Sequence, residues 1–259
     1  MPDASDLKIT PPFGYDEIAL LHRTDRVRLP DTNAPAFCRS LNAIALSVGE
    51  FAVASRDYPI VFASADGIRG FSPVIVLGLA DGQNLFVDDK GQWAADAYLP
   101  AFVRRYPFCI SRIFTDGKQQ ADRVICVARS HIDPSGAALY DAAGASTPQW
   151  ASYEKLLSEF EKDLDLTSAV CERLAGLGLF SPFRFQIKQG DATGLTLEGM
   201  YRIDESRLAA LPAEQIKALV AEGMMGRIYT HIQSLGNFTR LYSRAIERAA
   251  AAAQGSPDV

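Results

Sequence analysis

The chain has 259 residues, of which 48% are hydrophobic and 22% are charged, a composition typical of globular proteins. Its 26 Lys and Arg against 31 Asp and Glu give a net charge of −5, so it lacks the overall basic excess of many nucleic-acid-binding proteins. No apolar stretch approaches the roughly 20 residues of a membrane-spanning helix, and the N-terminus lacks the apolar segment of a secretory signal. We therefore expect a soluble, cytoplasmic protein that neither binds nucleic acid nor inserts into a membrane.

The four cysteines are far apart in the sequence and stand among apolar or aromatic neighbours. No Cys-x-x-Cys pair is present to bind zinc or to exchange disulfides. We expect buried free thiols, with no metal and no cofactor, at Cys38, Cys109, Cys126 and Cys171.

Residues 1–40 contain five prolines and show no sustained periodicity, which predicts an extended N-terminal arm. Short β-type runs then follow, separated by turns that place Gly after Asp or Lys at 66–67, 81–82, 90–91 and 116–117. The runs predict mostly antiparallel strands at 43–46, 51–54, 60–63, 74–79, 85–87, 108–114 and 124–128, with one helical turn at 98–105.

From residue 149 onward the apolar period becomes helical. Trp150, Tyr153, Leu157 and Phe160 predict one face of a first helix, and a second helix is predicted to start near Asp165 or Thr167 and to stop at the glycines 176 and 178. Residues 180–202 alternate as a hairpin whose turn spans 190–194. Two further helices are predicted, one after Pro212 and a long one over 225–253, followed by a disordered tail at 254–259.

Strands early in the chain and helices late indicate an α+β fold. We expect a mostly antiparallel sheet, built from the N-terminal half and the later hairpin, packed against the C-terminal helices. One domain over residues 41–253 is the simplest organisation.

Three stretches resemble the bacterial SapC family, which is named after a surface-layer gene cluster. They read EFAVA and DYPIVF at 50–54 and 57–62; VLGL, NLFV, GQW and YLPAFVRRYPF at 76–79, 84–87, 91–93 and 98–108; and LEGMYRID and IYTHIQSLGNF at 197–204 and 228–238. The resemblance implies a link to surface-layer biogenesis and to flavin-dependent halogenase-like proteins, whose genes often adjoin those of relatives. It supplies no reaction, and the chain departs from the family pattern at 128–134.

The paired arginines Arg104 and Arg105, followed by Tyr106, are the first candidate for ligand contact. Two forked guanidiniums beside aromatic rings can hold a carboxylate or phosphate and stack on a planar group. The alternative is an internal anchor paired with an aspartate such as Asp57, Asp88 or Asp89.

Aromatic and polar residues elsewhere in the resembling stretches extend this hypothesis to a groove. Residues 93–108 would face the last helix, which is predicted to carry further polar side chains, although aromatic residues at these spacings also build cores. The remaining candidate ligand-binding residues are Trp93, Tyr98, Tyr229, His231 and Asn237.

His131, Asp133 and His231 have the order of a two-histidine, one-carboxylate iron site, but the spacing is not diagnostic, and a surface loop and a helix histidine are the favoured explanation. Neither a nucleotide-binding glycine loop nor a Gly-x-Ser-x-Gly motif occurs, so the catalytic residues stay unknown.

The sequence favours an accessory or binding protein that recognises a peptide, a protein or a small anionic ligand through an Arg and aromatic groove. One alternative is a peptide-modifying enzyme or enzyme subunit that uses His231 and works with halogenase-like flavoproteins. The other is a protein of surface-layer biogenesis.

Overall fold

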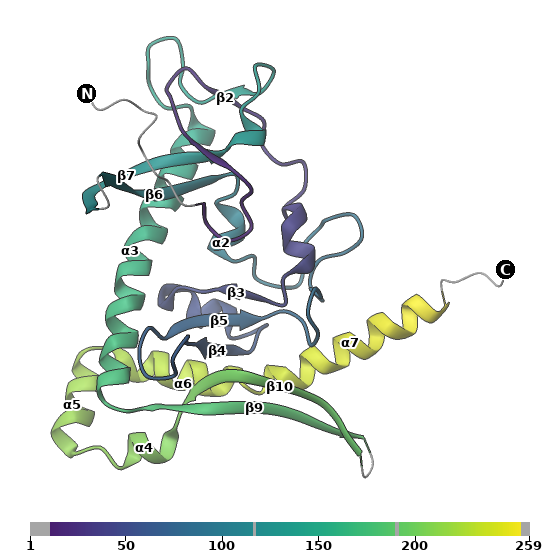
Figure 1. Cartoon of the computed structure of the whole chain (residues 1–259), viewed down its shortest axis with the longest axis vertical. Coiled ribbons are helices and arrows are strands. Elements are labelled where there is room, and N and C mark those ends of the chain that lie inside the picture. The colour runs from purple at the N-terminus through teal and green to yellow at the C-terminus, as the bar shows by residue number, and fades with distance from the viewer. Residues whose placement is uncertain (1–10, 116–117, 190–191, 255–259) are drawn as a thin grey trace. The chain divides into compact units, whose positions relative to one another are not determined.

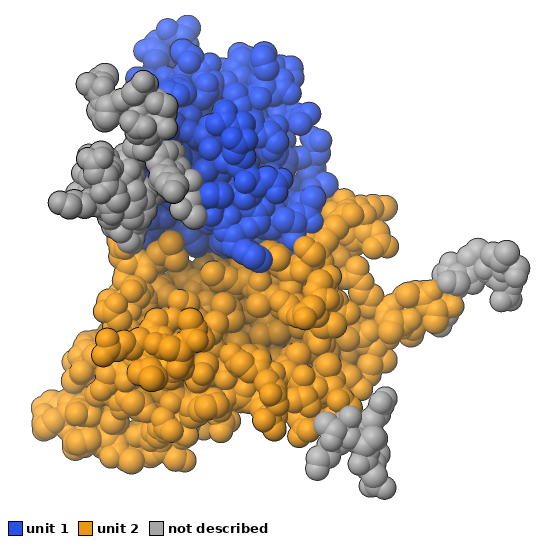
Figure 2. Space-filling model, in the orientation of Figure 1, with its two compact units in different colours: residues 1–38, 101–162 blue, residues 39–100, 163–259 orange. Residues whose placement is uncertain are grey.

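A computed structural model describes residues 11–115, 118–189 and 192–254 (Figure 1). The predicted turn at 116–117, residues 190–191 of the hairpin turn, the first ten residues of the arm and the tail from 255 lie outside this range. The chain divides into two compact units (Figure 2). Unit 1 comprises residues 1–38 and 101–162, and unit 2 comprises residues 39–100 and 163–259.

Unit 1 contains a three-stranded antiparallel sheet with the order β1 (Ile18–Leu20), β7 (Lys118–Ala128), β6 (Phe108–Thr115). A second sheet pairs β2 (Arg26–Val27) with β8 (Ala137–Ala138). The short helix α2 (Ala101–Arg104) precedes β6, at the position of the predicted helical turn. Within the segment predicted as an arm, β1 and β2 are strands, and Ala36–Ser40 is a 3-10 helix.

The core of unit 1 forms where α3 (Pro148–Gly176) meets β6. Trp150 is 1% exposed, and its ring centroid lies 4.8 Å from that of Phe108. Leu157 and Phe160 are buried about two and three turns further on, so the predicted helix face is confirmed. All four cysteines are buried and free, as predicted.

Unit 2 contains a five-stranded antiparallel sheet that joins early strands to the later hairpin. Its order is β3 (Ala43–Ala45), β5 (Ser72–Val76), β4 (Ile60–Ala63), β10 (Ala192–Ile203), β9 (Phe180–Gln189). The helices α4 (Glu205–Ala209), α5 (Ala213–Ala221), α6 (Met224–Ser234) and α7 (Asn237–Gln254) follow. The predicted α+β class is therefore confirmed.

Two predicted strands of unit 2 are wrong. Residues 51–54 form the helix α1 (Phe51–Ala54). Ser47 and Glu50 form a capping box at the 3-10 turn that directly precedes α1, and this turn sets the helical direction of the chain. The segment 85–87 contributes only an isolated bridge between Val87 and Trp93, because a tight turn folds the chain back at once.

Helix boundaries also differ from the prediction. α3 runs without interruption from 148 to 176, since no Gly or Pro occurs between these ends and the Thr167 hydroxyl bonds back to Asp163 O within the helix. The predicted long helix is instead split into α6 and α7 by a turn at 235–236, where Gly236 weakens the helix. None of the helices in the described ranges is long and apolar enough to cross a membrane.

Candidate functional site

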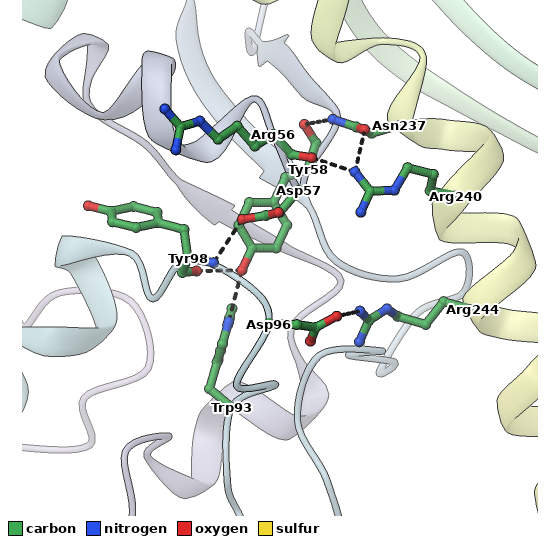
Figure 3. A network of polar contacts seen from close by, with 9 residues as sticks. All are labelled: Arg56, Asp57, Tyr58, Trp93, Asp96, Tyr98, Asn237, Arg240 and Arg244. Atoms are coloured by element: carbon green, nitrogen blue, oxygen red, sulfur yellow. Dashed lines mark hydrogen bonds and ion pairs between the residues drawn. The ribbon is translucent and has the colours of Figure 1, made fainter.

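A network of hydrogen bonds in unit 2 surrounds the fully buried Tyr58, two residues before β4 (Figure 3). The indole nitrogen of Trp93 donates to the Tyr58 hydroxyl at 2.8 Å, and that hydroxyl donates to the carbonyl of Tyr98. Burial raises the pKa of Tyr58 far above its ordinary value, so the phenol is a neutral donor. The Tyr98 amide in turn donates to Asp57 Oδ2 at 2.9 Å.

The segment 85–97 is shaped by a turn at Asp88. Its Oδ1 accepts the amides of Lys90 and Gln92 at 2.9 and 2.8 Å, and Gly91 has a φ of 76° that favours glycine. The returning chain stacks Trp93 on Phe86, with centroids 6.4 Å apart. The turn therefore builds an aromatic floor.

The first turn of α7 is attached to the loop before β4. Asn237 Nδ2 donates to the carbonyls of Ser55 and Tyr58 at 2.7 and 3.0 Å. Arg240 Nη1 donates to Asn237 Oδ1 at 3.3 Å and to the carbonyl of Arg56. These bonds fix where α7 begins.

Three arginines follow one face of α7, because residues four apart in a helix lie above one another. After Arg240, the Arg244 guanidinium lies 4.5 Å from the Phe86 centroid, and its Nη2 is 3.2 Å from Asp96 Oδ2. Arg248 Nη1 donates to the carbonyls of Asn84 and Val87 at 2.8 and 3.0 Å. Each arginine thus holds a different part of the loops opposite.

Two cavities open between these arginines and the loops, with volumes of about 240 and 460 Å³. Phe86 and Arg244 line both cavities, and we call the pair the α7 groove. Its charged lining residues are three guanidiniums, of Arg240, Arg244 and Arg248, and five carboxylates, of Asp57, Asp88, Asp89, Asp96 and Glu247.

Three of the predicted site residues come together in this network. Trp93 is 3% exposed and lines the larger cavity, whereas Asn237 is 8% exposed and lines neither cavity. Tyr98 is half-buried, and its hydroxyl donates to Glu50 Oε1 at 3.0 Å. Tyr229 lies on α6 with 43% of its surface exposed and lines neither cavity.

His231 is also predicted as a site residue, and it is fully buried in unit 2 between β4 and β10. Its Nε2 accepts the amide of Ile203 at 3.1 Å, so Nδ1 carries the proton and donates to Ile60 O at 2.9 Å. Burial lowers the pKa of His231 to about 4. The neutral imidazole thus links the backbones of β10 and β4 where a direct backbone hydrogen bond would otherwise lie, next to the Tyr201–Phe62 pair.

The iron hypothesis is wrong for His231, because both ring nitrogens are already hydrogen-bonded to backbone. Among the described residues, His, Cys, Asp and Glu side chains form no group of three that could hold a metal ion. His131 belongs to unit 1, where Nδ1 bonds to the carbonyl of Arg28 and the ring packs edge-on against Tyr106.

The paired arginines belong to unit 1 and differ from each other. Arg104 ends α2 and is exposed, whereas Arg105 is 5% exposed. The Arg105 guanidinium lies 4.9 Å from the Phe102 centroid and 4.6 Å from that of Phe160. Its Nε has no hydrogen-bond partner among the described residues, so aromatic rings are its main contacts.

Tyr106 is half-buried beside these arginines. Its ring packs against Tyr15 and Phe37, with centroids 5.1 and 5.5 Å away.

Sequence reasoning missed the groove residues on α7. The signal was present as arginines at 240, 244 and 248, a spacing of four within a predicted helix. The predicted carboxylate partners of the Arg104–Arg105 pair belong instead to unit 2, where Asp57 and Asp88 accept backbone amides and Asp89 lies 3.7 Å from Arg248.

Comparison with known proteins gives one match. A family model described as SapC matches residues 21–241, which covers both units and the groove up to the first turn of α7. No curated protein and no solved structure matches the chain. Because the family model spans most of the sequence, the chain belongs to the SapC family.

Proposed function

We propose that this SapC-family protein is a binding protein that recognises an extended peptide segment of a partner protein in the α7 groove. The observation that carries this proposal is the position of Arg244. Its side chain is 31% exposed, its guanidinium stacks on Phe86, and the residue lines both cavities. Arg and aromatic residues are enriched at protein interfaces, and Arg is among the residue types that dominate recognition energies.

The charges of the groove favour a peptide over a small anion. Five carboxylates face three guanidiniums, and each guanidinium already contacts a carbonyl or a carboxylate. A free phosphate or carboxylate would therefore meet a surplus of negative charge. The backbone of a peptide offers N–H donors to the carboxylates and C=O acceptors to the guanidiniums, and its apolar side chains can pack on the aromatic floor.

The enzyme alternative relied on His231 as a base. Both of its nitrogens hydrogen-bond to backbone and its pKa lies well below neutrality, so no observation favours that role. A binding role remains compatible with work beside halogenase-like flavoproteins or in surface-layer biogenesis, and those proteins are the first partners to test.

Selection of peptides from a random display library on the purified protein tests the proposal. Synthetic versions of the selected peptides are then titrated calorimetrically against wild type and Arg244→Ala. Loss of an interface arginine at a central position typically weakens binding about tenfold or more, and that is the expected result.

Arg184→Ala is the matched control, because Arg184 is an exposed, ion-paired arginine on β9 that does not line the groove. Its affinity should equal that of wild type. Selected peptides that bind Arg244→Ala as well as wild type, or a library that yields no binder, would contradict the proposal.

A further inference from the structure

Another cavity of unit 2 lies against the C-terminal half of α3 and shares no lining residue with the α7 groove. Its volume of about 650 Å³ falls within the roughly 300–1,000 Å³ typical of small-molecule sites. We call it the α3 pocket. One wall is the end of β3 with the loop that leads into β5, and the other wall is one side of α3 from Leu164 to Gly176.

Small residues form part of both walls of the pocket. Ala45 is exposed and sits opposite Val74 in the β3–β5 register, while Ala175 and Gly176 end the helical wall. The larger neighbours Leu46 and Phe71 are only 2% and 6% exposed. The apolar lining favours an aliphatic or aromatic group.

Arg69 brings a charge to this apolar pocket. The turn that carries it is held at both ends: Asp66 Oδ1 accepts the amides of Ile68 and Arg69 at 2.8 Å, and Ser64 Oγ donates to Arg69 O at 2.6 Å. The Arg69 guanidinium makes no hydrogen bond or ion pair with another residue that the structure describes. A preformed wall therefore presents a cation with its donors available.

Thr167, Ser168 and Glu172, three other polar residues of the pocket, form hydrogen bonds within the protein. The Thr167 hydroxyl accepts the Val48 amide at 2.9 Å and donates to Asp163 O. Glu172 accepts the hydroxyl of Ser168 at 3.3 Å. Among the lining residues, Arg69 thus has the most hydrogen-bond donors available to a charged partner.

We propose that the α3 pocket binds a small amphipathic molecule with an aliphatic body and a single carboxylate, the chemistry of a medium-chain fatty acid. The aliphatic chain lies between β3 and α3, and the carboxylate pairs with Arg69. Glu172 opposes the carboxylate and limits affinity. This site is independent of peptide binding in the α7 groove.

Calorimetric titration of the full chain with laurate, and with dodecanol as the uncharged analogue, tests the proposal below the concentration at which either ligand aggregates. Laurate should bind more tightly than dodecanol. Arg69→Gln should weaken laurate about fivefold, as expected for a partly exposed ion pair, and leave dodecanol unchanged. Glu172→Gln should strengthen laurate binding.

Filling the pocket tests the aliphatic part. Ala175→Leu should weaken both ligands about tenfold or more, because the new side chain occupies the volume that the chain would take. Ala169→Leu is the matched control, since Ala169 is exposed on the same helix and does not line the pocket. Equal unfolding midpoints of the two variants show that folding is intact.

The charge variants and the filling variant can each overturn the proposal. It fails if laurate does not bind wild type, or if Ala175→Leu binds laurate like Ala169→Leu. It also fails if Arg69→Gln and Glu172→Gln shift laurate affinity in the same direction. Selected peptides that bind wild type but are displaced by laurate would place the ligand in the α7 groove, and would contradict a separate site.

Discussion

The interface around His231 and the α7 groove are both built on hydrogen bonds from helix side chains to backbone, but the first is closed and the second is open. In both, side chains of a helix in unit 2 bond to backbone of neighbouring strands or loops. His231 and Ser234 are short, 0% and 1% exposed, and bond to Ile60 at distances near 3 Å. The arginines of α7 are long and partly exposed, and they leave cavities between helix and loops. Short side chains close an interface, whereas long ones can hold it open for a ligand.

The largest expected effect is at the closed interface. His231→Ala should lower the free energy of unfolding by about 3 kcal/mol or more, because it leaves the Ile203 amide and the Ile60 carbonyl unpaired and opens a cavity. Urea denaturation measures this. Arg244→Ala, made for comparison in the groove, should cost less than half as much, and equal losses would remove the distinction between the two regions.

The pH dependence sharpens the same contrast. An unfolded histidine takes up a proton near pH 6.5, whereas the pKa of folded His231 is about 4, because burial disfavours the charged imidazolium. Between these values the unfolded state binds more protons than the folded state. The contribution of His231 to stability is therefore complete above about pH 6.5 and falls as the pH drops towards 4. The loss over this window is about 2–3 kcal/mol.

His231→Gln isolates that contribution, because Gln keeps a donor and an acceptor but does not titrate. The difference in unfolding free energy between wild type and His231→Gln should shrink between pH 7 and pH 4. A constant difference would mean that the histidine titrates alike in both states.

Helix and strand periodicity predicted most of unit 2, because burial of one face is a local pattern. The sequence predicted β4, the β9–β10 hairpin and α5. It misassigned 51–54, where apolar residues alternate with alanine, because the capping box at Ser47 and Glu50 outweighs strand preference. That competition is visible only once the side chains are placed.

The candidate site was predictable in part. Aromatic content and resemblance pointed to Trp93, Tyr98 and Asn237, which lie in the hydrogen-bond network around Tyr58. They did not separate buried supports from surface groups, because burial depends on contacts distant in sequence. Asn237, for example, bonds to Ser55 and Tyr58, about 180 positions away.

Arg105 extends the comparison to unit 1. Arg105→Lys should lower the unfolding free energy by about 1–2 kcal/mol, because an ammonium cannot spread over the rings of Phe102 and Phe160 as a planar guanidinium does. Thermal unfolding gives the result. An unchanged midpoint, together with weaker binding of selected peptides, would instead make Arg105 a ligand-contacting residue.

The smallest expected change in stability is for Arg244→Lys in the groove. Arg244 is partly exposed and its partner Asp96 is 73% exposed, so the ion pair is screened by water and the substitution should cost about 0.5 kcal/mol or less. Binding should respond more, because lysine keeps the charge but loses the planar fork that stacks on Phe86 while bonding to Asp96. Arg184→Lys, in the exposed pair with Glu198, should change neither quantity. If Arg244→Lys lowers stability as much as Arg105→Lys does, the arginines of α7 are structural clamps like the interior ones, and the groove between them holds no peptide.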